Sequence, residues 1–94
     1  MTTVDAQAIK LISLGTNRYS DKIGYFKGIA KAAQNDKIKI VNAKQIIAVV
    51  NLEIASTGVA EPHTFSGNEI TCTSNTGSTT LNGVIIYRWW LWVT

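Results

Sequence analysis

The sequence is short of the residues that build metal sites and disulfides. Its 94 residues include one cysteine, Cys72, and one histidine, His63. A single cysteine excludes a disulfide within the chain, and in a stretch rich in Thr and Ser we expect it to be a small buried apolar residue. Metal sites need clustered Cys, His or carboxylate ligands, so we predict no metal and no cofactor, and His63 is expected to be a polar loop residue.

Catalytic and nucleotide-binding signatures are missing as well. The chain has neither the GxxxxGK[ST] loop nor the GxGxxG loop that cradles phosphates, and no residue lies in the local signature of an activated nucleophile. Gly24 and Gly28 are four residues apart, a spacing that we interpret as packing against another backbone. We therefore expect a protein that is not an enzyme.

Charged residues and long apolar runs are scarce. Only 16% of the residues are charged, against about 25% in a typical soluble domain, while 46% are hydrophobic. This balance suggests that another molecule covers part of the surface. The apolar runs are far shorter than the ~18 residues of a membrane-spanning helix, and the first residues lack the basic and apolar parts of a signal peptide. We expect a single soluble domain over residues 1–94, made in the cytoplasm.

The net charge of +3 is unevenly distributed. Residues 1–44 carry eight Lys and Arg against three Asp, whereas residues 45–94 carry one Arg against three Glu. A basic first half can mark a surface that contacts a polyanion, or it can consist of solvated lysines. Arginine, which dominates the recognition of phosphates and bases, occurs only twice. Nucleic-acid binding is therefore an alternative function, and its candidate contacts are Lys22, Lys27, Lys31, Lys37 and Lys39.

Residues 1–36 are predicted to be helical. Thr2 and Asp5 form a Thr-x-x-Asp capping pattern, and apolar residues follow at near-helical spacing until Gly15. A second helix is predicted to begin at Ser20 and to end within 34–36. Its apolar face would consist of Ile23, Phe26, Ile29, Ala30 and Ala33.

Residues 37–94 are predicted to be β-rich. Alternating polar and apolar residues predict strands over 37–41 and 68–74, and residues 56–67 look like a loop. Asn82 and Gly83 predict a tight turn that leads into a long final strand over 84–93. Residues 43–51 are predicted to form either a strand, which their β-branched pairs favour, or a short helix. The expected fold class is α+β: two N-terminal helices packed on a mostly antiparallel sheet or small β-sandwich formed by the second half.

All three tryptophans lie in the last six residues. Each Trp buries about 150–250 Å², so an uncovered tail would expose more apolar surface than soluble monomers tolerate. The tail is therefore a strand of the chain's own core, an arm docked on a neighbouring copy, or an anchor at a membrane surface. As a strand it would turn Trp90 and Trp92 to one side, and a helix would cover one side through Phe26 and Ile29. The candidate interface residues are Arg88, Trp89, Trp90, Leu91, Trp92 and Val93.

The run from Glu69 to Tyr87 is rich in Thr, Ser, Gly and Asn and closes on an apolar strand. In composition, about residues 45–90 resemble small structural proteins of tailed-phage virions, especially capsid decoration (cement) proteins. Such proteins are compact, bind at capsomer junctions, often as trimers or dimers, and reinforce the shell. The resemblance implies a virion subunit whose partners are copies of itself or a major capsid or other virion protein, with no membrane. A small viral inhibitor of a host protein is a further alternative.

Overall fold

The structure, a computed structural model, describes residues 2–13, 21–75 and 77–89. These residues form eight strands and no helix. In chain order the strands are β1 (Thr3–Ala6), β2 (Ile9–Ser13), β3 (Asp21–Lys31), β4 (Lys37–Ile40), β5 (Ala43–Ile54), β6 (His63–Ser66), β7 (Glu69–Cys72) and β8 (Thr79–Trp89). Within the described ranges, no helix is long and apolar enough to cross a membrane.

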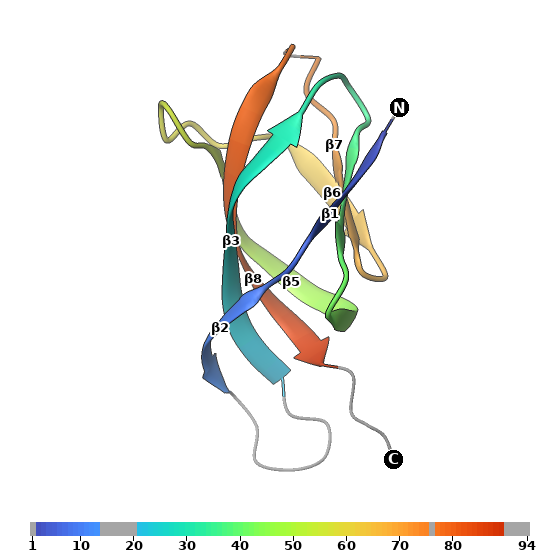
Figure 1. Ribbon diagram of the computed structural model, residues 1–94, viewed down its shortest axis with the longest axis vertical. Helices are drawn as coiled ribbons and strands as arrows, with labels where there is room; N and C mark the ends of the chain where they lie inside the picture. The colour runs from blue at the N-terminus through green and yellow to red at the C-terminus, as the bar shows by residue number, and fades with distance from the viewer. Residues whose placement is uncertain (1, 14–20, 76, 90–94) are drawn as a thin grey trace.

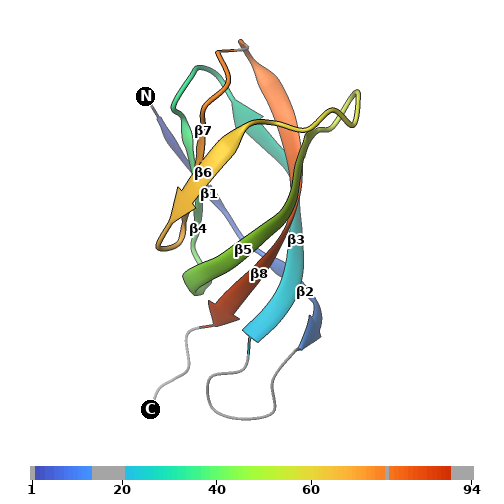
Figure 2. The ribbon, with the colours of Figure 1, turned by 180° about the vertical axis from the view of Figure 1, so that it is seen from behind.

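The strands form two four-stranded sheets that face each other (Figure 1). The small sheet has the order β1-β4-β7-β6, with β1 parallel to β4 and the other neighbours antiparallel. The large sheet has the order β2-β3-β8-β5 and is antiparallel throughout. Seen from behind, the long strands β3, β8 and β5 run side by side across the molecule (Figure 2). The architecture is a β-sandwich.

The chain passes from the small sheet to the large sheet between β1 and β2, through Gln7 and Ala8. Asn42 holds this crossing in place. The backbone N–H of Ala8 donates to Oδ1 of Asn42 (2.9 Å), and Nδ2 of Asn42 donates to the carbonyl of Ala8 (2.9 Å). Ala6 at the end of β1 and Ala8 in the crossing are both buried. The core between the sheets contains Phe26, Ile38, Ile40, Ile46, Leu52, Ile70, Cys72, Leu81, Ile85 and Tyr87.

The prediction of two N-terminal helices is wrong, because residues 3–31 contain three strands, and the expected α+β class gives way to an all-β fold. The central strand β3 pairs with β8 from Asp21 to Lys31, with one bulge between Phe26 and Ile29. A Cβ at Gly24 would lie 2.7 Å from the ring of Tyr87, so this glycine permits close packing across two strands rather than two helices. Gly28 adopts a φ of 70° at the bulge, a conformation that glycine tolerates best.

The β-rich predictions for the second half are confirmed in part. The strands over 37–41 and 68–74 correspond to β4 and β7, and residues 43–51 are a strand. The loop over 56–67 contains the short strand β6, which the prediction missed. The turn at Asn82 and Gly83 is wrong, since both residues lie inside β8. Oδ1 of Asn82 accepts a hydrogen bond from the backbone N–H of Gly28 (3.0 Å), across to β3.

Candidate functional site: an apolar face of the large sheet

The large sheet has one side against the small sheet and one side that faces away from it, which we call the outer face. Strand alternation assigns β3 residues to each side. Gly24 and Phe26 are buried toward the core, so the odd-numbered residues from 21 to 27 lie on the outer face. Along β8 the buried residues are 81, 83, 85 and 87, so the even-numbered residues from 82 to 88 lie on it.

Two rows of mostly apolar residues cross the middle of the outer face. In the first row, Ile23 of β3 lies opposite one residue of β2 and one residue of β8. In the second row, Tyr25 of β3 likewise lies opposite one residue of each of these strands. The β2 members of both rows are more than half exposed, at 54% and 53%. Soluble domains rarely leave several large apolar side chains together in water. From β2 to β8, the rows are Ile12, Ile23 and Ile86, then Ile9, Tyr25 and Val84.

Charged residues bound these rows at both ends of the outer face. At one end Asp21 lies opposite Arg88, and Nε of Arg88 is 3.1 Å from Oδ1 of Asp21. At the other end Lys27 lies on β3, with its Nζ 5.7 Å from the ring centroid of Tyr25. Glu53 of β5 completes this end opposite Asn82. Each end therefore carries one acid and one base.

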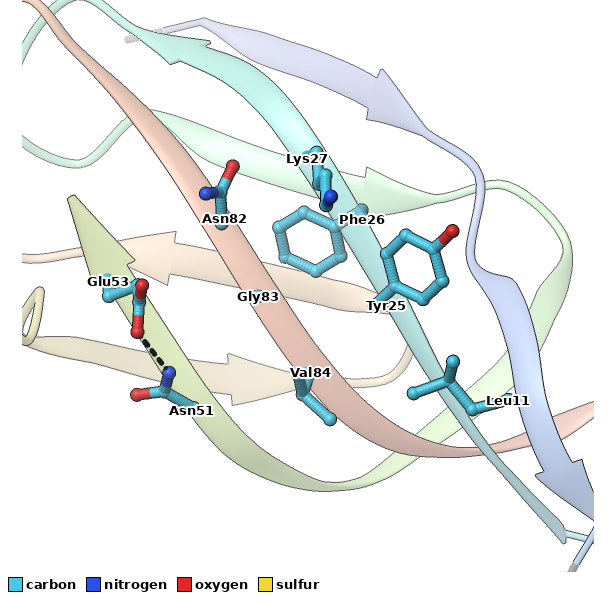
Figure 3. A pocket seen from close by; sticks show the side chains of 9 residues that line it. All are labelled: Leu11, Tyr25, Phe26, Lys27, Asn51, Glu53, Asn82, Gly83 and Val84. Carbon is cyan, nitrogen blue, oxygen red and sulfur yellow. Dashed lines mark hydrogen bonds between the residues drawn. The ribbon is translucent and has the colours of Figure 1, made fainter. Parts of the chain in front are cut away.

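A hollow of about 400 Å³ lies on the outer face between the second apolar row and the Lys27 end (Figure 3). Its floor includes Val84 and Asn82, and Tyr25 forms one wall. On the other side, Nδ2 of Asn51 donates to Oε1 of Glu53 (2.6 Å). An apolar side chain fits such a hollow, and a charged head group fits its rim.

A second group of polar residues is buried in the interior of the sandwich. Nζ of Lys31 donates to Oε2 of Glu61 (3.0 Å) and to the carbonyl of Ser74 (2.9 Å), and both charged side chains are 1% exposed. Burial, followed by the negative charge of Glu61, raises the pKa of the Cys72 thiol to about 11. The thiol stays protonated at neutral pH and is a poor nucleophile, in line with its predicted role as a buried apolar residue.

Asp36 joins several segments through its carboxylate. Oδ2 accepts the backbone N–H groups of Ala32 (2.9 Å) and Ala33 (3.0 Å), and Oδ1 accepts that of Thr2 (2.9 Å). These hydrogen bonds, the one from Ala32 first, lower the pKa of Asp36. The carboxylate therefore has a structural role. Among the described residues, no three His, Cys, Asp or Glu side chains are grouped to hold a metal ion.

The predicted tail interface is described only at its beginning. Arg88 lies on the outer face at the Asp21 end, and β8 ends at Trp89, whose backbone lies opposite Ala43. The predicted residues Trp90, Leu91, Trp92 and Val93, and the division of the tryptophans between two sides, lie outside the described residues. No helix covers that strand at Phe26, which is instead a core residue of β3.

The structure distributes the five candidate polyanion contacts over different places. Lys27 lies at one end of the outer face, and Nζ of Lys22 donates to Oγ of Ser13 at the other end of β3 (3.4 Å). Lys31 is buried in its pair with Glu61. Lys37 and Lys39 lie together on β4 in the small sheet, where Nζ of Lys37 is 3.8 Å from Glu69.

Sequence reasoning missed the two apolar rows. A signal for them is present in the stretch from Asp21 to Lys27, where every second residue is charged, apolar, apolar and charged. Read with a period of two, this stretch predicts a strand face with an apolar centre and charged ends. Read with a helical period, Ile23 instead joins Phe26 on one side.

No family model, curated protein or solved structure matches the chain. A function for the protein therefore has to follow from the outer face and from the composition of the chain.

Proposed function

We propose that the chain is a non-enzymatic structural subunit, which stabilises a larger assembly by burying its outer face against a neighbouring subunit. The observation that carries this proposal is the pair of apolar rows, whose β2 members Ile9 and Ile12 are more than half exposed. Burial of apolar surface is the main favourable contribution to protein association. A face with an apolar centre and a charged border has the composition of a protein interface.

The assembly that we propose is a virus shell, with the chain as a capsid decoration (cement) protein or another minor shell subunit of the virion. The compositional resemblance over about residues 45–90 supports this assignment. The low charged fraction of 16% supports it too, because a subunit with several neighbours needs less charged surface.

Sedimentation of a lysate tests the proposal, with Val84→Lys as the variant. The lysate comes from the cells in which the chain is naturally made. We expect the wild-type chain to sediment with large particles. We expect Val84→Lys to remain with small proteins, because an ammonium in the second apolar row must be desolvated on docking. The lysine stem can lie along the neighbouring apolar residues, so the variant should fold.

Val59→Lys is the matched control. Val59 is 58% exposed and lies in the segment between β5 and β6, outside the two apolar rows. The control should sediment like the wild-type chain, and circular dichroism should show the same fold for all three proteins. A wild-type chain that never sediments with particles overturns the proposed function. Particle binding that Val84→Lys leaves unchanged shows that the outer face is not the contact.

A further inference from the structure

We propose that the outer face docks on the same face of a second copy, around a two-fold axis that lies in the interface and runs perpendicular to the strands. This inference rests on the proposed function and names the partner of its interface. Under such an axis each strand of one copy lies over the same strand of the other copy and runs in the opposite direction. Each end of the outer face therefore meets the opposite end of the partner's face.

The order of the rows makes the outer face complementary to itself under this operation. Four rows follow one another along the strands: a charged row, two apolar rows and a second charged row. Reversal places each apolar row on an apolar row and each charged row on a charged row. Ile23 then lies over the partner's Tyr25, and Ile86 lies over the partner's Val84. The apolar residues that a single copy leaves exposed are covered by the same residues of the other copy.

The charges also fit this arrangement. Asp21 and Lys27 are six residues apart on β3, or about 20 Å at roughly 3.3 Å per residue, which exceeds the Debye length of about 8 Å at physiological salt. Within one copy they hardly attract each other. In the dimer Asp21 faces the partner's Lys27. Arg88 faces the strand that lies next to the strand of the partner's Glu53. A two-fold axis along the strands would instead place Lys27 over the uncharged Asn82, so the perpendicular axis pairs more charges.

The hollow on the outer face lies where this docking brings the partner's opposite end. It is bounded by Tyr25 and Val84 on the apolar side and by Lys27 and Glu53 on the charged side. The reversed partner presents Ile86 and Arg88 above it. The isoleucine has an apolar floor to contact, and the guanidinium reaches the carboxylate of Glu53. The second copy therefore fills a space that one copy leaves open.

Complementary charge reversals test the docking and its direction. Lys27→Glu places a carboxylate over the partner's Asp21, and Asp21→Lys places an ammonium over the partner's Lys27. Each variant alone should dimerise at least about tenfold more weakly than the wild-type chain, because two like-charge contacts form in each dimer. A mixture of the two variants restores opposite charges at both contacts. We expect it to form a heterodimer with close to wild-type affinity, measured by light scattering and native mass spectrometry.

Lys39→Glu is the control, because Lys39 is an exposed lysine of the small sheet. It makes the same charge change and should leave the dimer unchanged. A sodium chloride titration of the wild-type chain is a second measurement that needs no variant, and it should weaken the dimer. A monomeric wild-type chain, or two variants that fail to combine while each is folded by circular dichroism, overturns the inference. A monomer that still sediments with particles contradicts the inference but leaves the proposed function standing. A dimer that never sediments with particles contradicts the proposed function but leaves the inference of a dimer standing.

Discussion

Lys31 and Glu61 form an ion pair in the interior of the sandwich. Both side chains are 1% exposed, so both charges have left water. Their attraction and the hydrogen bond from Lys31 to the carbonyl of Ser74 offset that desolvation. Such a pair adds little net stability compared with an apolar pair of the same size. It does make the loss of either partner severe, because the other charge then stays buried alone.

Glu61→Gln should therefore lower the free energy of unfolding by about 3–5 kcal/mol. The amide keeps the shape of the side chain but removes the charge that compensates the ammonium of Lys31. Urea unfolding at neutral pH measures the change. The double variant Lys31→Met with Glu61→Leu removes both charges and should recover most of the loss.

Glu69→Gln provides the matched control for this variant. Glu69 pairs with Lys37 at 3.8 Å, where the side chains are 36% and 35% exposed. Exposed pairs contribute about 0–1 kcal/mol, so the control should change stability by no more than that. Equal effects of the two Glu→Gln substitutions would show that the buried pair is not a constraint on the fold.

At the scale of the elements, β3 and β8 are held at close range by a glycine. A Cβ at Gly83 would lie less than 3.0 Å from three ring atoms of Phe26, and that ring is 2% exposed. The ring cannot turn outward without leaving the core. Gly83→Ala should therefore destabilise the fold by about 1–3 kcal/mol, the usual result of overpacking a core. Thermal unfolding followed by circular dichroism measures the effect.

Gly77→Ala tests whether the loss comes from the contact with Phe26. A Cβ at Gly77 would meet no atom within 4 Å, so this substitution should leave the thermal midpoint nearly unchanged. Gly83→Ala combined with Phe26→Leu should recover part of the loss, because the smaller side chain makes room. A Gly83→Ala variant as stable as Gly77→Ala would contradict the packing that we describe.

The same elements show how far the sequence alone predicts this fold. β4 and β7 were predicted because each has one buried side, which leaves an alternating pattern in the sequence. β3 was missed because Ile23, Phe26 and Ile29 satisfy a helical period as well as a strand bulge. Its state depends on pairing with β8, some 55 residues later in the chain, and local patterns do not report such pairing.

The candidate site could be predicted only at its charged ends. Arg88 was selected with the tryptophan tail and Lys27 as a polyanion contact, and the structure places both on the outer face. Of the two apolar rows between them, Ile23 was assigned to the core face of a helix, whereas Val84 and Ile86 were assigned to the predicted final strand. Whether an apolar side chain faces the interior or the outside depends on which strands lie beside it, and the sequence does not contain that information locally.

At the scale of the whole molecule, Asp36 connects both sheets. Its carboxylate holds the N–H groups of Ala32 and Ala33 after β3 and of Thr2 before β1. Its backbone carbonyl accepts the N–H of Cys72 in β7 (2.9 Å). The segments that Asp36 joins come from the large sheet, from both parallel strands of the small sheet and from the strand beside them. Losing this carboxylate should therefore weaken the fold as a unit.

Acid should weaken the fold through this residue in a defined pH range. The folded-state pKa of Asp36 is lowered, so the unfolded chain takes up a proton at this carboxyl group at a higher pH than the folded chain does. Its contribution to stability is complete above the unfolded pKa of about 3.9 and is lost as the pH falls through the folded pKa. Asp36→Asn should lower the thermal midpoint at pH 7, and the gap to the wild-type chain should narrow below about pH 4. Asp5→Asn removes an exposed carboxylate of β1 with the same change in charge, and its gap to the wild-type chain at pH 7 should be small. A gap for Asp36→Asn that stays constant down to pH 2 would contradict the lowered folded-state pKa, because ionisation of this carboxyl group would then contribute nothing that acid removes.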